Sequence, residues 1–398
     1  MIVTIPPSLQ HFCEKFRNIL SKNQMKNIPM LFTGIILTRD KRTQSALGRS
    51  VKQSCRHRAS ISKFMRRVGF RTRDIFSHMC HECISYITAR GKQKKRTWVL
   101  SIDGTSTKRG GFSKIANAVQ YKKKAKNKKG KSTKAHTFVM GLLITECGMR
   151  IPVPRRSYYT RRYCRKHKKK HKTQQELAVL MIESLKLPED VALVVVADEY
   201  FEGEKLCNVC NRLGHTMIVP VDSRRCFADA NGKSSGTGLH RRGKRIARDA
   251  FKKMVLVQGK ENTVSYRRYS SKKSRSTCKR TYRVFQEIRD VTALGDTNIV
   301  YSWKSPVYRP RRDASKETFK VLICNNLRMS AQEIVEWYEV RWQIELFFRE
   351  LKSHLGMGDY CGTDFRAFER HVDLVLMSFL FLEWHRMELL EEKRISPK

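Results

Sequence analysis

The sequence predicts a mixed α/β fold, and three segments support that prediction. Val191–Ala197 is continuously apolar, as expected for a strand buried on both faces. Thr97–Asp103 is a second apolar, β-rich run, and it ends in an Asp-Gly pair. Ala331–Gly356 has apolar residues at helical spacing and no proline, which predicts one long helix. Strands and helices are therefore expected to alternate through the middle and the end of the chain.

Residues 1–95 are expected to be helical. Apolar residues recur every three or four positions in Leu9–Leu20 and in Ser60–Phe76, with Ser60 as the expected N-cap of the second helix. The second segment also carries a row of cations, at Lys63, Arg66, Arg67, Arg71 and Arg73. This pattern suits a small DNA-binding region. It also suits a basic, solvated face on a packing helix, and both interpretations stay open.

Residues 96–203 are expected to form the first part of the main domain. Ile115–Tyr121 and Thr137–Thr145 have the composition of strands, and a lysine-rich run between them, residues 121–134, is typical of an exposed low-complexity tip. Arg155–Lys172 is a second cationic block with interleaved tyrosines, which suits phosphate contacts together with base or sugar stacking. Thr173–Leu185 predicts a capped amphipathic helix before the strand that ends at Asp198.

Residues 204–328 return to a β-like pattern and predict a separate strand-rich insertion. The strand candidates are Met254–Gln258, Asn262–Ser270, Thr281–Val291, Asn298–Trp303 and Phe319–Cys324. Residues 329–398 then complete the main domain, and Ser330 is the expected N-cap of the long helix.

The composition points to a polyanionic partner. Lys and Arg number 82 against 36 Asp and Glu, a net charge of +46 over 398 residues. Nucleic acid is the simplest partner for such a charge, with ribosomal association or an anionic membrane surface as competing interpretations. No signal peptide is evident, and the apolar runs Ile28–Leu37 and Leu374–Leu382 are shorter than the roughly 20 residues that span a bilayer. We expect no membrane insertion, and both runs are expected in the core.

The 12 cysteines show no regular framework, which predicts reduced thiols in a cytoplasmic compartment. Cys80 with Cys83, and Cys207 with Cys210, each have the spacing of half a zinc site. The other half of the ligand set is missing in both cases. Small apolar fillers of the core are therefore the default interpretation.

The predicted long helix carries a narrow polar stripe. At about 100° per residue, Tyr338, Arg341, Glu345 and Lys352 fall within a sector roughly 60° wide that apolar residues flank on both sides. A salt-bridged surface face is the ordinary explanation for such charges. A carboxylate beside two cations and fenced by aromatic residues also suits the wall of a functional site.

Two strands that each end in one aspartate resemble the opening of a ribonuclease-H-like core. Asp103 and Asp198 would then lie at the ends of neighbouring strands, and Glu345 of the helix would join them. Three carboxylates can hold two divalent metals, one to activate the attacking water or hydroxyl and one to stabilise the leaving oxygen of a phosphodiester. Arg341 and Lys352 would hold DNA phosphates, and Tyr338 would bind a phosphate or pack on a sugar.

The helix motif resembles that of bacterial insertion-sequence transposases of the DDE class, in which a β-strand insertion precedes the catalytic glutamate. The spacing Y-x2-R-x3-E-x6-K is met by the four stripe residues, within the text R-W-Q-I-E-L-F-F-R-E-L-K. Ile102–Thr105 and Ala197–Phe201 resemble the first and second aspartate motifs of that family. The resemblance covers roughly residues 97 to 371; the helix motif is specific, and each aspartate motif alone is weak.

The resemblance implies a ribonuclease-H-like core in which Asp103, Asp198 and Glu345 bind two Mg²⁺ ions, with Mn²⁺ as a substitute. It implies cut-and-paste transposition, which is metal-dependent cleavage at transposon ends followed by attack of the freed 3′-hydroxyl on target DNA. The partner would be DNA bound by a homodimer in a bacterial, nucleoid-associated setting, without a small-molecule cofactor. Relatives flip a base onto aromatic residues of the insertion, where Trp303 is the one tryptophan.

Three other functions remain open at this level. A metal-dependent DNA nuclease of the same fold would cut without joining. A non-enzymatic, DNA-binding descendant of a transposase would keep the fold without the chemistry, although all three acids are present. A basic RNA-binding or ribosome-associated protein would explain the charge but not the fenced stripe.

Overall fold

The computed structural model describes residues 4–39, 41–51, 58–66, 71–90, 96–109, 115–122, 132–249, 254–258, 281–305 and 319–395. The chain divides into two compact units, and each is described here by itself. Unit 1 comprises Met1–Arg96, Asp103–Val191 and Ile344–Lys398, and unit 2 comprises Thr97–Ile102 and Ala192–Gln343. Both units therefore combine segments that are far apart in the sequence.

Unit 1 begins with helices. They are α1 (Pro7–Glu14), α2 (Lys22–Leu37), α3 (Gln44–Ser50), α4 (Arg58–Arg66) and α5 (Thr72–Arg90). A capping box between Ser21 and Gln24 fixes the start of α2. The expectation for Ser60 is wrong, because α4 already begins at Arg58 and Ser60 lies inside it. The expected helix Ser60–Phe76 is instead divided between α4 and α5, and Arg67 lies outside the described residues.

Unit 1 contains the strands β2 (Val119–Lys122), β3 (Ser132–Ile144) and β4 (Arg150–Ser157) and the second half of β1 (Arg96–Lys108), from Asp103 onward. β3 pairs antiparallel with β2 and with β4. β2 and β3 confirm two predicted strands, and the interior of the lysine-rich run between them lies outside the described residues. β4 was not predicted, because its arginines led us to treat the segment as part of a cationic block.

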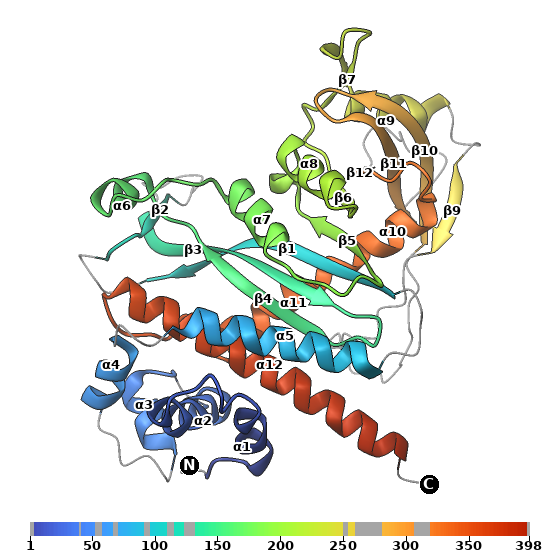
Figure 1. Ribbon diagram of the computed structural model, residues 1–398. Helices are drawn as coiled ribbons and strands as arrows, with labels where there is room; N and C mark the ends of the chain where they lie inside the picture. Colours follow the sequence, from blue (N-terminus) through green and yellow to red (C-terminus); the bar gives the residue numbers. More distant parts are fainter. Residues whose placement is uncertain are drawn as a thin grey trace, which may run out of the picture. The chain divides into compact units, whose positions relative to one another are not determined.

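Unit 1 also contains helices that follow β4 in the sequence. α6 (Arg161–Lys166) leads to α7 (Gln174–Glu183), whose predicted N-terminus is confirmed by a capping box between Thr173 and Glu176. α12 (Phe365–Ile395) packs on α2, α5 and β4, and Figure 1 shows α5 running alongside it. Both predicted apolar runs lie in helices, α2 and α12, and most of their residues are buried, although the last residue of each, Leu37 and Leu382, is exposed. Across the described part of the chain, no helix is long and apolar enough to cross a membrane.

Unit 2 is organised around a mixed sheet. β5 (Val191–Ala197) pairs parallel with β6 (Thr216–Pro220), and β6 pairs antiparallel with β12 (Phe319–Cys324). The sheet continues through β11 (Gly295–Ser305) to β10 (Thr281–Val291), which also pairs with β9 (Val255–Gln258) and β7 (Cys226–Ala228). β8 (Ser234–Gly238) pairs with β7. The predicted bounds of β10 and β12 are confirmed to the residue, and the strand expected at residues 262–270 lies outside the described residues.

Unit 2 also contains helices, and the one at Leu239–Asp249 was not predicted. α8 (Glu204–Arg212) packs on β6, α9 (Leu239–Asp249) packs on β8 and β12, and α10 (Ala331–Val340) packs on β6 and β9–β11. α9 comes close to β12 because Gly243 lacks a side chain, since a Cβ there would lie 2.3 Å from a ring carbon of Phe319. Unit 2 is therefore a sheet covered by helices, and the strand-rich segment is part of it.

The expectation of one long helix from Ala331 to Gly356 is wrong in detail. Ser330 caps α10 as predicted, through a capping box with Glu333. α10 ends at Val340, α11 (Trp342–Arg349) follows, and a π-helical turn occupies Glu350–His354. The π turn widens the last turn of the helix, so side chains there leave the regular helical stripe that the sequence predicted.

Candidate active site

Asp103 lies within β1, with its side chain half-buried. The strand was expected to end at this residue, but it continues to Lys108. The backbone N–H of Gly104 donates a hydrogen bond to Oδ1 of Asp103 at 2.6 Å. A Cβ on Gly104 would lie 2.7 Å from the side-chain oxygen of Gln174, so the glycine lets the start of α7 lie close beside the aspartate.

Lys352 of the π turn interacts with Asp103. The surrounding protein lowers the pKa of the Lys352 ammonium, and the nearby Asp103 carboxylate raises it in opposition. The Lys352 Nζ atom also lies 5.6 Å from the ring centroid of Phe348. The last residue of the helix motif therefore lies within electrostatic reach of the first aspartate motif, and both belong to unit 1.

Glu345 lies in the first turn of α11, half-buried between Ile344 and Leu346, both of which are buried. Phe347 fixes the orientation of this helix, because its ring packs edge-on against Phe379 of α12 with centroids 4.8 Å apart. Asp103, Glu345 and Lys352 thus belong to one compact unit, on elements that a shared apolar core holds in place.

The end of the π turn is clamped by the N-terminal helices. Arg42 donates hydrogen bonds to the carbonyl oxygens of Ile35 and His354, and its backbone N–H donates to Asp359. Gly356 has φ +66°, and a Cβ there would lie 2.4 Å from both the Arg42 and the Asp359 side chains. The turn that carries the site lysine is therefore braced by residues from the first fifty positions of the chain.

Asp198 belongs to unit 2 and follows β5, as predicted. Its side chain is half-buried and caps a short 3₁₀ helix, η1 (Glu199–Phe201), by accepting a hydrogen bond from the Glu199 N–H at 2.8 Å. The next acid, Glu202, is buried and forms an ion pair with Arg225. Burial raises the pKa of Glu202, and Arg225 opposes that rise.

Tyr338 and Arg341 also belong to unit 2. The Tyr338 ring is buried beneath two cations, with Lys320 Nζ 5.1 Å and Arg341 Cζ 5.9 Å from its centroid. The carbonyl oxygen of Arg341 accepts a hydrogen bond from the Ser101 hydroxyl at 3.3 Å. Tyr338 therefore supports a pair of cations by cation–π contact rather than reaching out as an exposed side chain.

Trp303 is buried, with 2% of its surface exposed. Its ring stacks on Phe319 with centroids 5.0 Å apart and planes 24° from parallel. Phe319 is in turn covered by α9 at Gly243. In this arrangement the indole occupies the core of unit 2, and a base could stack on it only after Phe319 had moved.

The three acids have the donor chemistry that Mg²⁺ prefers, since each offers carboxylate oxygens and each is half-buried rather than sealed from water. The part of the chain that the structure describes contains no group of three His, Cys, Asp or Glu side chains already close enough to hold a metal. Asp103 and Glu345 lie in unit 1 and Asp198 in unit 2, so the two parts of the predicted ligand set are described separately.

The paired cysteines are core residues. Cys80 and Cys83 are buried in α5, and Cys207 and Cys210 are buried in α8. Burial raises the pKa of all four thiols, so they stay protonated. Their spacing reflects one helical face directed at the core, in agreement with the default interpretation.

The sequence analysis missed a basic stripe on α9. Arg241, Lys244 and Arg245 are exposed, while Leu239 and Ile246 on the opposite side are buried. The i, i+3, i+4 spacing of these cations was visible in the sequence. It was overlooked because the neighbouring residues carry a β-like pattern.

Comparison with known proteins decides the family. A family model described as "Transposase DDE domain" matches residues 94–381, more than two thirds of the chain. The chain belongs to this family. It is also 27% identical over 85 residues to the "Probable transposase for insertion sequence element IS5377" of Geobacillus stearothermophilus. That match takes in 21% of this chain and 22% of the relative's length. The resemblance predicted from the helix motif is confirmed, and the match to the DDE family includes all seven predicted site residues.

Proposed function

We propose that this protein is a DNA transposase that cleaves DNA at transposon ends and joins the freed 3′-hydroxyl to target DNA. The main support is the placement of Asp103, Glu345 and Lys352 in one compact unit of a chain that belongs to the DDE family, because it brings acids and a cation of separate motifs into the same part of the fold. A carboxylate that binds metal and an ammonium that binds phosphate are both needed beside a scissile phosphodiester.

We assign metal binding to Asp103, Asp198 and Glu345, with two Mg²⁺ ions as the expected cofactor and Mn²⁺ as a substitute. Bound metal would activate the attacking oxygen and stabilise the leaving oxygen. Lys352 would hold a phosphate next to Asp103. Arg341, supported by the Tyr338 ring, would hold a second backbone phosphate.

The proposed architecture follows the family. Residues 96–203 and 329–398 would form a ribonuclease-H-like core, residues 204–328 an insertion, and residues 1–95 a region that helps to bind DNA. A homodimer would act on the two transposon ends. This arrangement is supported by the order of acids along the chain, with the strand-rich segment between the second and the third.

The decisive test is cleavage of a duplex that carries a transposon end. Asp103→Asn, Asp198→Asn and Glu345→Gln should each reduce metal-dependent cleavage by at least about a thousandfold, as expected when one member of a cooperating group is removed. Binding of the duplex should persist. Glu336→Gln, at a half-buried acid of α10 outside the proposed site, is the matched control and should keep full activity. Full activity in one of the three variants would remove that residue from the proposal.

Metal binding has a readout that does not depend on activity. Mg²⁺ should raise the melting temperature of the wild type, and it should raise that of the triple variant less. An equal rise in both proteins would show that the ions bind elsewhere.

Joining separates a transposase from the two main alternatives. A nuclease of the same fold would yield cut ends but no product with a 3′-end linked to target DNA, and a DNA-binding descendant would yield neither.

Arg341→Ala and Lys352→Ala should weaken end binding and each lower the salt dependence by about one unit of slope. Unchanged binding and turnover in these variants would show that neither Arg341 nor Lys352 contacts DNA.

The proposed role of Trp303 needs its own experiment, because the residue is buried against Phe319. A fluorescent base analogue at the transposon end should brighten when the base is unstacked on binding. Trp303→Phe should alter that signal while preserving the fold, and Phe285→Leu in the neighbouring strand is the control. An unaltered signal would leave Trp303 a core residue only.

A further inference from the structure

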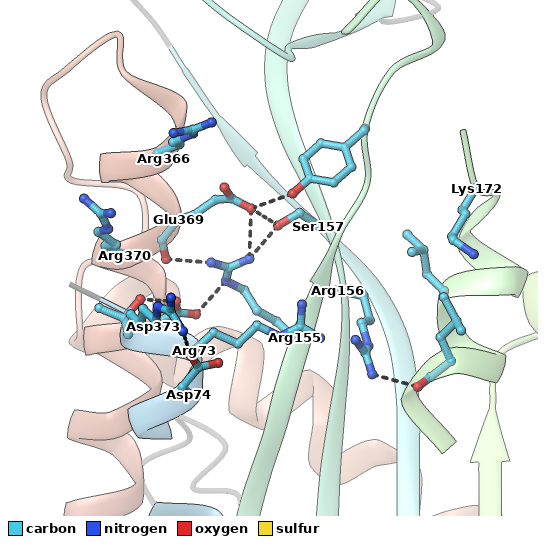
Figure 2. Close-up of a pocket in the computed structure, with 15 residues that line it drawn as sticks. Arg73, Asp74, Arg155, Arg156, Ser157, Lys172, Arg366, Glu369, Arg370 and Asp373 are labelled. Carbon is cyan, nitrogen blue, oxygen red and sulfur yellow. Dashed lines mark hydrogen bonds and ion pairs between the residues drawn. The ribbon is translucent and has the colours of Figure 1, made fainter. Parts of the chain in front are cut away.

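Unit 1 contains a basic pocket that the catalytic proposal does not use. The pocket has a volume of about 470 Å³ and lies among the start of α5, β4, α7 and α12 (Figure 2). Its lining includes seven cationic and three acidic side chains. We call it the β4 pocket. None of Asp103, Glu345 and Lys352 lines it.

The floor of the β4 pocket is a neutralised network. Arg155 of β4 is buried, and its guanidinium pairs with Asp373 at 2.9 Å and with Glu369 at 3.4 Å. Thr72 donates a hydrogen bond to Asp373 at 2.6 Å. Figure 2 shows Arg155 directed at these two acids of α12, beside Ser157. The network fixes three elements together and uses two of the three acids of the pocket.

Of the remaining cations, Arg71 pairs with Asp74 at 4.0 Å, and the others form a rim without an ion pair among the described residues. Arg156 donates to two neutral acceptors, the Leu180 carbonyl at 2.7 Å and the Ser184 hydroxyl. Burial and the nearby charge of Arg73 lower the pKa of Arg156 to about 10. With that pKa the guanidinium of Arg156 is still charged at neutral pH, and the charges of Arg156 and Arg73 repel each other.

Other rim cations come from α12 and from the segment before α7. Arg370 donates to the Met65 carbonyl at 2.6 Å, and burial lowers its pKa. Arg366 is exposed beside it, and Lys172 is half-buried on the opposite side of β4, as Figure 2 shows. Cations that face one cavity with their ion-pairing capacity unused are arranged to receive an anion.

The pocket is linked to the proposed active site through α7. Leu177 and Leu180 of this helix line the pocket, and Gln174 in its first turn lies against Gly104, next to Asp103. Asp103 and the pocket therefore lie beside the same helix of unit 1. Arginine forks match phosphate geometry, and the fixed floor keeps the rim in position before binding.

We propose that the β4 pocket binds the phosphodiester backbone of DNA as an anchor beside the active site. This inference rests on the proposed function and adds a second contact surface in unit 1. The contact would position the duplex without reading its sequence, because it involves phosphates only.

The test compares two pairs of substitutions that remove the same charge. Arg73→Gln with Arg366→Gln alters two exposed rim cations, which leaves the floor intact. Arg212→Gln with Arg328→Gln alters two exposed arginines outside the pocket. Binding of a short duplex of arbitrary sequence is measured by fluorescence anisotropy over a range of salt concentrations, in the Asp103→Asn background so that no cleavage intervenes.

The rim pair should weaken binding by about tenfold more than the control pair and lower the salt slope by about two units, one for each lost phosphate contact. Equal losses in the two pairs would overturn the inference, because bulk charge would then explain both. Unchanged binding in the rim pair would overturn it as well. If the parent protein bound no duplex at all, the proposed function would itself fail, and this outcome is recognisable before any rim variant is made.

A free anion is the other source of a phosphate group. Inorganic phosphate is therefore added to the full-length protein while the melting temperature is followed. A rise that the rim pair abolishes, together with duplex binding that the rim pair leaves intact, would assign the pocket to a small anion and overturn the DNA inference. Competition between phosphate and the duplex for the pocket would support it.

Discussion

Unit 1 and unit 2 are stabilised by different interactions. In unit 1, buried and half-buried arginines are fixed by buried acids of α12, as in Arg155 with Asp373 and Arg150 with Glu383. Unit 2 has one such pair, Glu202 with Arg225, among the pairs described above, and its described core is otherwise built on the sheet and on stacked rings such as Trp303 with Phe319. The chain has only 36 acids for its 82 cations. Three of these acids lie on α12 and hold arginines of β4 in fixed positions. Unit 1 should therefore be sensitive to charge and pH, and unit 2 to side-chain volume.

The largest effect is expected at Glu383. This buried carboxylate accepts hydrogen bonds from Arg150 at 2.6 Å and from Arg386 at 2.9 Å. Glu383→Gln leaves the Arg150 charge without its main partner, which should lower the free energy of unfolding by about 3–5 kcal/mol. Urea denaturation at neutral pH measures this loss in the free energy of unfolding. A loss no greater than that of an exposed acid such as Glu392, in a Glu392→Gln variant, would contradict the role of buried pairs in unit 1.

A pH effect should follow from His136 of β3. Its ring is buried against Phe365 and Phe368, and burial lowers its pKa to about 4. The unfolded chain takes up this proton near pH 6.5. Stability from the neutral ring is therefore complete above about pH 6.5 and is lost as the pH falls toward 4, by about 3 kcal/mol in total.

Denaturation curves across this range should show the loss for the wild type, and a smaller one for His136→Gln. His167→Gln, at an exposed histidine, serves as the control. Parallel pH profiles for the wild type and His136→Gln would contradict the assignment. His371 is also buried with a lowered pKa, so part of the dependence should survive in the variant.

A smaller loss is expected at Gly356. Its φ of +66° disfavours any side chain, and a Cβ would displace Arg42 and Asp359. Gly356→Ala should cost about 2 kcal/mol of unfolding free energy and should also weaken the electrostatic contact of Lys352 with Asp103. Thermal denaturation gives the first quantity and end cleavage the second. Gly148→Ala, also at positive φ but with open space around it, should affect stability and spare cleavage.

The smallest effect is expected in unit 2. Glu287 pairs with Arg242 at 3.2 Å, but that arginine is more than a third exposed, so solvent screens the pair. Glu287→Gln should cost only about 1 kcal/mol. A loss as large as that of Glu383→Gln would remove the contrast between the two units.

Local patterns in the sequence predicted what local interactions determine. The β-branched run of β12 and the caps at Thr173 and Ser330 need only neighbouring residues, and all were predicted. β4 was missed because Arg155 looks solvent-exposed until its partner Asp373, far along the chain, is known. The end of the π turn depends in the same way on a distant residue, since Arg42 holds the His354 carbonyl from outside the helix.

The candidate site shows the same division. Asp103, Glu345 and Lys352 could be selected from spacing and motif, because those are properties of the sequence itself. Lys352 feels the charge of Asp103 from within the π turn, which no periodicity indicated. Trp303 was selected as the one tryptophan of its segment, and its burial under Phe319 and α9 could not be anticipated because α9 was unknown.

The clamp at Arg42 also bears on how the protein can be divided. The match to the DDE family begins at residue 94, yet Arg42 holds the carbonyl of His354 and the Asp359 carboxylate inside the matched region. A fragment cut at the edge of the match would leave these acceptors without their donor, next to the lysine that faces Asp103. The family match and the contacts that brace it therefore have different limits along the sequence, and a recombinant fragment of this protein should begin before α2.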